Sequence, residues 1–317
     1  MGNGNELGRL TGEPLSRREI TVRTRRVIND YARESIKALY PTVRRGEGKV
    51  IIGSVPGRPE DDQLGIDSYG EDLLANLIRD IQLPAIVLGE HNPPTFTEFG
   101  QPQVIIPIDA FDNSSEYMRG LDTPVYTVVS AYSLDGKPIA GAVCNIRDRK
   151  AFIAHDGGVY ELDTEMPDHY SQVFASRRTT LKDDKATIAS YLGSKEYSLK
   201  FFKHFGKMIE DMPPKARLYA GGGAFIYGLL ANGSVDAYVM FDEPYSEIFP
   251  GFTLARSAKC TVVSVNPDGS YEEIKLTPEF YENPQLYVEG KVPFFIAAAT
   301  PEIRDEIIDY YMKARKD

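Results

Sequence analysis

Two aspartates three residues apart, Asp109 and Asp112, are the residues of this sequence best placed to do chemistry. They follow the apolar run VIIPI at 104–108 and precede the small polar residues Asn-Ser-Ser at 113–115. Such a run predicts a buried strand, and ligands bind where strands end at a sheet edge. Two carboxylates there can hold a hard cation such as Mg²⁺, which prefers charged oxygen ligands. The alternative is a solvated turn whose side chains cap their own backbone.

Three further acids stand beside the expected ends of secondary structure elements. Asp67 lies near the start of a helix, Glu90 follows the short strand PAIVL, and Glu247 opens a helix after the apolar run AYVMF. Carboxylates from distant segments can converge on one divalent ion when their elements end at the same edge. The sequence therefore favours a metal site over a simple turn.

The first half of the chain must position four of these acids. Helical spacing and a capping box of Ser16 and Glu19 predict a helix over 16–39, which Pro41 should end, and a second helix is expected over 67–81. Residues 46–63 predict a hairpin or a mobile loop. An antiparallel half-sheet should follow, with Asp-Gly turns between its strands at 125–132, 139–146, 150–154 and 159–162.

The second half alternates strands and helices, which indicates a separate α/β layer. Strands are expected at 172–175, 216–220, 235–241, 260–265 and 294–298, and helices at 195–212, 223–231, 245–258 and 301–314. We therefore predict a flexible tail over 1–15, an α+β metal-binding domain over 16–170 and an α/β substrate domain over 171–317.

Composition excludes several classes of function. The 317 residues are 42% hydrophobic and 11% aromatic, enough to fill real cores, and the formal charge of −10 argues against a general nucleic-acid binder. Cys144 and Cys260 stand inside apolar runs, so buried thiols are expected. No apolar run reaches the length of a membrane span and the first residues lack the apolar core of a secretory signal, so we expect no membrane association and a cytoplasmic location.

The order of the acidic motifs resembles the inositol monophosphatase and fructose-1,6-bisphosphatase superfamily. Gly89-Glu90-His91 stands where that superfamily has Gly-Glu-Glu, Asp109-Ala110-Phe111-Asp112-Asn113-Ser114 where it has Asp-Pro-Ile-Asp-Gly-Thr, and Ser246-Glu247 where it has Trp-Asp. The likeness extends to Asp67 and Glu71, to Gly141–Val143, to the Gly-Gly-Gly-Ala run at 221–224, and to the run ending at Tyr238.

The resemblance implies an α/β (α+β) fold, a layered αβαβα sandwich with an antiparallel N-terminal sheet and a second α/β half. It also implies a Mg²⁺-dependent, Li⁺-sensitive hydrolase of a small sugar or inositol phosphate, with two or three Mg²⁺ ions, Mn²⁺ as a substitute, and a homodimeric assembly. No nucleic acid is expected as a partner.

The resemblance also implies roles for particular residues. It assigns Glu90, Asp109 and the Phe111 carbonyl to a first ion, and Asp109, Asp112 and Glu247 to a second. The catalytic set is Asp67, Glu90 and Ser114, which should orient and activate the attacking water. Phosphate should face the backbone amides of Asn113 and Ser114, and the substrate should contact Arg217, Gly222 and Gly223.

Several alternatives remain open. Matching Pro107-Ile108-Asp109 to the Pro-Ile-Asp of the motif would put Ile106 at the first metal acid and indicate a degenerate member that binds an anion or a partner. Within the enzyme hypothesis, the substrate can be fructose 1,6-bisphosphate or 3′-phosphoadenosine 5′-phosphate. A second substrate phosphate could be held by basic residues of the second half, namely Arg177, Arg178, Lys195, Lys200, Arg217 and Lys259. The four histidines, including His91, show no zinc-ligand spacing.

Overall fold

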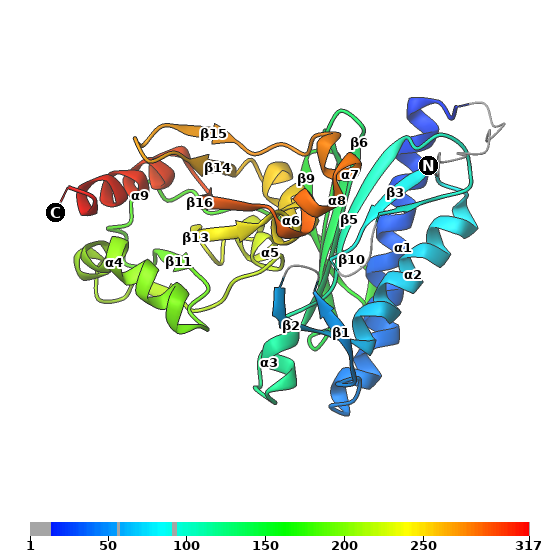
Figure 1. The fold of residues 1–317 in the computed structure, drawn as a ribbon, viewed down its shortest axis with the longest axis horizontal. Coiled ribbons are helices and arrows are strands. Elements are labelled where there is room, and N and C mark those ends of the chain that lie inside the picture. Colours follow the sequence, from blue (N-terminus) through cyan, green and yellow to red (C-terminus); the bar gives the residue numbers. More distant parts are fainter. Residues whose placement is uncertain (1–13, 56–57, 91–93, 317) are drawn as a thin grey trace, which may run out of the picture.

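The computed structural model describes residues 14–55, 58–90 and 94–316. The predicted tail therefore lies almost wholly outside the described residues, and so does His91. Figure 1 shows the described chain as alternating layers of helix and sheet. Two helices cover one face of a first sheet, further helices fill the space between that sheet and a second one, and two helices cover the far face of the second sheet. The predicted layered αβαβα sandwich is confirmed.

The first helical layer consists of α1 (Arg17–Arg44) and α2 (Gly65–Ile81). The predicted capping box is present, because the Ser16 hydroxyl accepts the Glu19 N–H and the Glu19 carboxylate accepts the Ser16 N–H. The expectation that Pro41 ends α1 is wrong. A proline removes one backbone hydrogen bond, but α1 continues to Arg44 because Leu39 and Val43, one turn apart, are both buried in the same apolar cluster.

The first sheet has eight strands in the order β10-β9-β8-β7-β6-β5-β3-β4. Its neighbouring strands are antiparallel except β3 and β5, which are parallel. The strands are β3 (Ala85–Leu88), β4 (Thr95–Phe96), β5 (Val104–Asp112), β6 (Tyr126–Ser133), β7 (Pro138–Asn145), β8 (Lys150–His155), β9 (Gly158–Asp163) and β10 (Met166–Val173).

Two connections of the first half differ from or refine the expectation. Residues 46–63 contain a hairpin of β1 (Ile51–Val55) and β2 (Arg58–Leu64), so of the two alternatives the hairpin is found. The strand expected at 172–175 does not begin the second half. It is the end of β10, whose residues Tyr170 to Val173 pair with β9, so the edge of the first sheet extends beyond residue 170.

The second sheet has six strands in the order β12-β11-β13-β16-β14-β15. Its strands are β11 (Thr187–Ala189), β12 (Arg217–Tyr219), β13 (Ala237–Pro244), β14 (Thr261–Val265), β15 (Tyr271–Glu273) and β16 (Lys291–Ala298). Its outer face is covered by α4 (Lys195–Asp211) and α9 (Pro301–Ala314). The short α3 (Ser114–Met118) follows β5, and the remaining helices lie between the sheets: α5 (Ile226–Ala231), α6 (Tyr245–Ser257), α7 (Glu279–Glu282) and α8 (Pro284–Glu289).

The helix α6 forms the centre of the largest core. Residues 248–255 of this helix are all buried, as expected for a helix packed between two sheets. Two hydroxyls of β6 fasten it to the first sheet: Tyr132 donates to the Phe249 carbonyl and Ser130 to the Pro250 carbonyl, both at 2.6 Å.

Cys144 and Cys260 are buried free thiols, as predicted. Among the described helices, none has both the length and the apolar character that crossing a bilayer requires.

Candidate active site

An irregularity in β5 explains how two acids three residues apart serve one site. Side chains alternate between the faces of a strand, so a spacing of three would place Asp109 and Asp112 on opposite faces. In the structure Asp109 pairs with Val128 and Asp112 with Tyr126, so β5 uses three residue steps where β6 uses two. One extra residue of this kind is a β-bulge, which re-aims the side chains around it. Both carboxylates consequently meet the second half of the chain.

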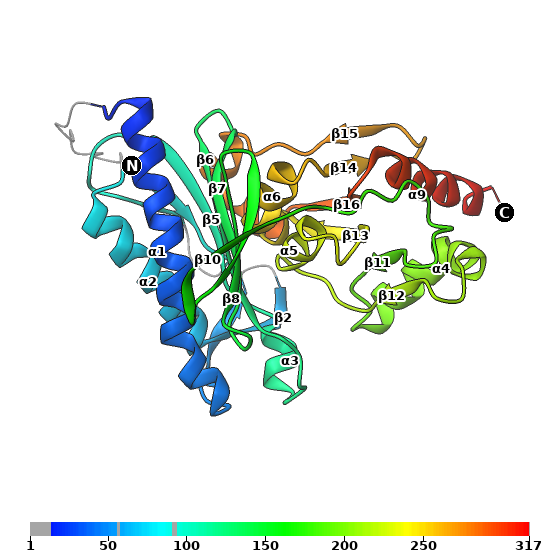
Figure 2. The ribbon, with the colours of Figure 1, turned by 180° about the vertical axis from the view of Figure 1, so that it is seen from behind.

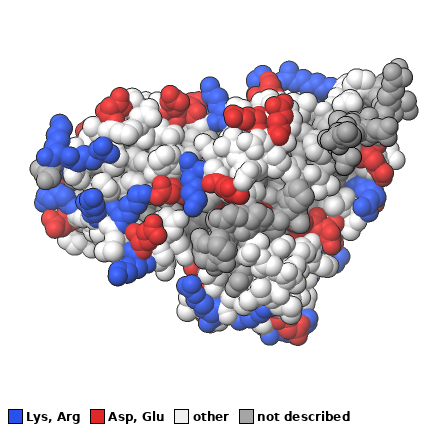
Figure 3. All heavy atoms as spheres, in the orientation of Figure 1, with Lys and Arg blue, Asp and Glu red and all other residues white. Residues whose placement is uncertain are grey.

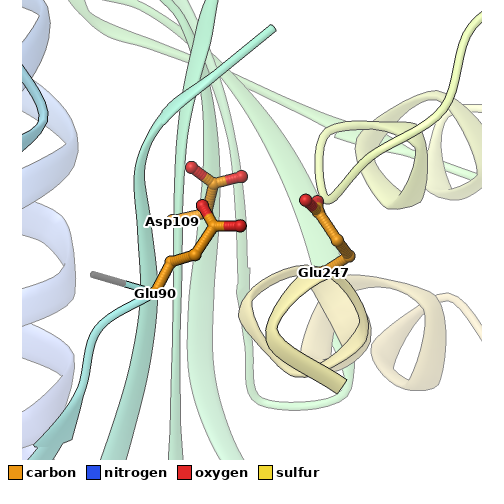
Figure 4. A group of neighbouring side chains, drawn as sticks. All are labelled: Glu90, Asp109 and Glu247. Carbon is orange, nitrogen blue, oxygen red and sulfur yellow. The ribbon is translucent and has the colours of Figure 1, made fainter. Parts of the chain in front are cut away.

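Three of the predicted acids converge. Carboxylate oxygens of Glu90, Asp109 and Glu247 all lie within 4.8 Å of one another. Figure 4 shows Glu90 and Asp109 side by side, with Glu247 reaching toward them from the first turn of α6. Asp109 is 4% exposed, and burial, followed by the charges of Asp112, Glu247 and Glu90, raises the pKa of Asp109 well above its usual range. The group is therefore a concentration of negative charge that a cation would relieve.

Asp112 has a different environment. Its Oδ2 accepts the backbone N–H of Phe225 at 2.6 Å, at the start of α5, and its carboxylate lies against Gly223. Burial and the charge of Glu90 raise the pKa of Asp112 to about 8, while hydrogen bonds from the Phe225 and Asn113 amides oppose this rise. The structure thus places Asp112 next to Asp109, but turned toward the backbone of the second half.

The glycine turn before α5 is shaped by this contact. Gly223 has a φ of +119°, and a β-carbon there would approach an Asp112 oxygen to 2.5 Å. At Gly222 a β-carbon would meet the Tyr191 side chain at 2.5 Å. Both glycines are needed because the backbone passes close to other groups. Arg217, which was predicted to contact the substrate with them, is exposed on the edge strand β12.

Asp67 stands in the first turn of α2, as predicted. It is 2% exposed and accepts the backbone N–H of Leu64 at 2.5 Å. Burial and the charges of Glu90 and Glu71 raise the pKa of Asp67 to about 8. A β-carbon on residue 89 would come within 2.5 Å of a Glu71 carboxylate oxygen, so Gly89 leaves room for the Glu71 side chain as it lies here.

The residues after Asp112 begin α3. Asn113 has a φ of +69°, and its side-chain amide donates to the Pro124 carbonyl at 2.9 Å. Its backbone amide is next to the Asp112 carboxylate. Ser114 is the first residue of α3. The helix is held against β5 by an edge-to-face contact between the Phe111 and Tyr117 rings, whose centroids are 5.2 Å apart. The predicted phosphate amides therefore adjoin the acids, with the Asn113 amide engaged by Asp112.

A buried pair that the sequence reasoning missed supports the glycine turn. The Tyr238 hydroxyl donates to Glu243 at 2.8 Å and accepts the Gly223 N–H at 3.1 Å. Glu243 is 2% exposed and Tyr238 is fully buried. Glu243 sits in the run FDEPYSE just before Glu247, and an acid inside an apolar strand was the only signal that pointed to it.

Two of the basic residues considered for a second phosphate have structural partners. Arg178 pairs with the buried Asp236 and with Asp183, each at 3.1 Å. Lys200 pairs with Asp242. These contacts bind segments of the second half to each other.

The fold and the acids together define a class: a layered sandwich of two sheets whose inner edge carries an oxygen-rich site suited to a hard divalent cation. In detail it is the inositol monophosphatase fold. SuhB, the extragenic suppressor protein of Bartonella henselae, is similar over 90% of this chain and 97% of its own, with a TM-score of 0.67 and 17% identity.

Two further structures give the same result. An inositol monophosphatase of Thermotoga maritima matches 91% of this chain and 98% of its own, with a TM-score of 0.65 and 14% identity. SaIMPase-II, solved with inositol monophosphate bound, matches 91% and 95%, with a TM-score of 0.61 and 15% identity. No protein-family model and no curated protein matches the sequence itself. At these identities the likeness establishes the fold, which is the fold that the resemblance implied.

Proposed function

We propose that this chain is a metal-dependent phosphomonoesterase that hydrolyses a small sugar or inositol phosphate. The observation that carries the proposal is the convergence of Glu90, Asp109 and Glu247 oxygens within 4.8 Å. Three carboxylates this close repel one another, and a hard cation with oxygen ligands is the usual partner of such a group. The donor set fits Mg²⁺, with Mn²⁺ as a substitute. Support for the phosphate ester comes from the fold shared with inositol monophosphatases.

The residues present would divide the work as follows. Glu90, Asp109 and Glu247 would hold the metal, and the Phe111 carbonyl and Asp112 would complete a set for more than one ion. Bound there, Mg²⁺ would offset charge on the phosphoryl group and lower the pKa of a water. Burial raises the pKa of Asp67 to about 8, which suits that group, with Ser114 beside the site, to exchange a proton slightly above neutral pH.

Phosphate release tests the proposal directly. The purified protein should release phosphate at millimolar Mg²⁺ from at least one of inositol 1-phosphate, fructose 1,6-bisphosphate and 3′-phosphoadenosine 5′-phosphate, and Li⁺ should inhibit it. Asp109→Asn should lower the rate by a factor of at least 100, since it removes one of the three carboxylates that converge in the proposed metal site, here called the carboxylate trio. The matched control is Asp309→Asn, at an exposed side chain of α9, and it should leave the rate unchanged. Absence of release from every ester would refute the phosphatase.

A second candidate function is favoured by the Asp112 contact. Because its carboxylate already accepts the Phe225 amide, the chain could be a degenerate member that binds an anion or a partner without turnover. Calorimetric titration with Mg²⁺ separates the cases when it is combined with the ester panel. Absence of any Mg²⁺ or Mn²⁺ binding, together with no hydrolysis, would support the second candidate, and metal binding with hydrolysis the first.

The predicted homodimer belongs to the proposal and is tested by sedimentation velocity.

A further inference from the structure

A basic cavity lies outside the acidic site. It has a volume of about 560 Å³ and opens between the C-terminal end of α1, the start of the β1–β2 hairpin and the segment after α3. Four cationic side chains and one carboxylate line it: Arg44, Arg45, Lys49, Arg147 and Asp122. Figure 3 shows Lys and Arg side chains at the lower edge of the molecule, where α3 and the end of α1 lie in Figure 1. This excess of positive charge stands out in a chain whose formal charge is −10.

Two of the four cations have only weak partners. Arg147 pairs with Asp122, whose side chain is 98% exposed, and Arg45 pairs with Glu47 at 2.8 Å, whose side chain is 54% exposed. Ion pairs open to water contribute at most about 1 kcal/mol. An anion with several charges can therefore compete for both arginines.

The other two cations, Arg44 and Lys49, pair with no carboxylate among the side chains that the structure describes. The Lys49 ammonium lies 4.8 Å from the centroid of the Tyr117 ring and is half-buried. The ring is itself fixed, because the Tyr117 hydroxyl donates to the Glu47 carbonyl at 2.6 Å. Lys49 is thus a positioned cation on the cavity wall, held by the face of an aromatic ring.

The cavity is separated from the acidic site by apolar packing. The Tyr117 ring, which lines the cavity, contacts Phe111, the residue that directly precedes Asp112 in β5. Phe111 and Tyr117 belong to one buried apolar cluster with Leu39. The two sites therefore share a wall, but their charges are opposite.

We propose that this cavity binds a small anion carrying two or more phosphate groups, at a site separate from the carboxylate trio. Four cations in one concave site match the charge of a diphosphate better than that of a single carboxylate, and arginines bind phosphate oxygens through pairs of N–H donors. The volume lies in the range of small-molecule sites. The proposal does not depend on phosphatase activity, because no metal is needed for binding here.

The test is calorimetric titration of the full chain with inorganic pyrophosphate, after metal has been removed over a chelating resin. Without metal, the carboxylate trio repels the anion, so binding reports a site outside the trio, and the variants below assign it to the basic cavity. About one pyrophosphate per chain is expected, with an affinity that falls as salt is added. The Arg44→Gln/Lys49→Met double variant should weaken binding at least tenfold. Methionine keeps the apolar stem that packs on Tyr117, and circular dichroism verifies the fold.

A matched pair of substitutions provides the control. Lys137→Gln/Lys215→Gln removes the same charge at side chains that are 70% and 80% exposed, outside the cavity. It should leave pyrophosphate affinity within a factor of two. Equal losses in both double variants, or no binding by the unaltered chain, would overturn the proposal. Either result would leave the phosphatase assay with Mg²⁺ unaffected.

Discussion

Removing the charge of Asp67 should stabilise the metal-free protein, increasingly so as the pH rises. Asp67 is 2% exposed, and its pKa is about 8 in the fold against 3.8 for an ordinary aspartate, chiefly because of burial. A raised carboxyl pKa means that the unfolded chain releases its proton first. Stability from this group is then fully present below pH 4 and is lost as the pH rises toward 8.

The magnitude follows from the difference between the two pKa values. Each pKa unit corresponds to about 1.4 kcal/mol, so ionisation of Asp67 lowers the free energy of unfolding by at most about 6 kcal/mol between pH 4 and pH 8. Asp67→Asn removes the titrating group, and the amide oxygen can still accept the Leu64 N–H. The variant should match the unaltered protein near pH 4 and exceed its stability by several kcal/mol at pH 8.

Urea unfolding at pH 4, 5, 6, 7 and 8, without metal, measures this difference. Because the chain contains no tryptophan, helical circular dichroism is the suitable signal. Asp309→Asn, at an exposed side chain of α9, is the control and should follow the unaltered protein at every pH. If the Asp67→Asn and unaltered curves ran parallel over the whole range, the buried and repelled carboxyl described above would be refuted.

Three further predictions concern the supports of the site. Gly223→Ala places a β-carbon 2.5 Å from an Asp112 oxygen and should weaken Mg²⁺ binding, measured by calorimetry, at least tenfold. In the control, Gly206→Ala, the β-carbon enters open space inside α4, so the free energy of unfolding should rise by about 1 kcal/mol. Tyr238→Phe removes the donor to buried Glu243 and should lower the free energy of unfolding by about 1 to 3 kcal/mol in urea titrations; no change would contradict the network. Mg²⁺ at 100 times its dissociation constant should raise the free energy of unfolding by about 2.7 kcal/mol. The affinity of the protein for Mg²⁺ should also rise between pH 6 and pH 8, because protons leave the Asp109 and Asp112 carboxyls over this range. An affinity independent of pH would contradict this prediction.

The sequence located most elements of the fold, and the reasons for its failures are physical. Amphipathic helices and alternating strands extend over many residues, so their periodicity survives local exceptions. Strands of three residues, such as β11 and β15, are too short to show a period. The expectation that Pro41 ends α1 failed because the helix is continued by the burial of Val43, and that burial depends on partners that are distant in sequence. The five layers were implied by the family resemblance and not by periodicity.

The sequence showed which acidic residues stand at the ends of helices and strands, but it did not show how their side chains are arranged around the site. The bulge in β5 depends on which residues of β6 lie opposite Asp109 and Asp112, and cross-strand register is not a local property. The same limit applies to Asp112, whose amide partner Phe225 is 113 positions away. The roles assigned to the individual acids, and the division at residues 170 and 171, remain predictions.

The position of Glu247 on α6 also has a consequence for biosynthesis. A ribosome makes Glu90 and Asp109 long before the helix that carries the third acid, and α6 takes its place only when it is packed between both sheets. Chains emerge and fold from the N-terminus onward. An incomplete nascent polypeptide therefore lacks the third carboxylate of the proposed metal site and should capture metal poorly. Full occupancy of that proposed site would require that both the synthesis and the docking of α6 are finished.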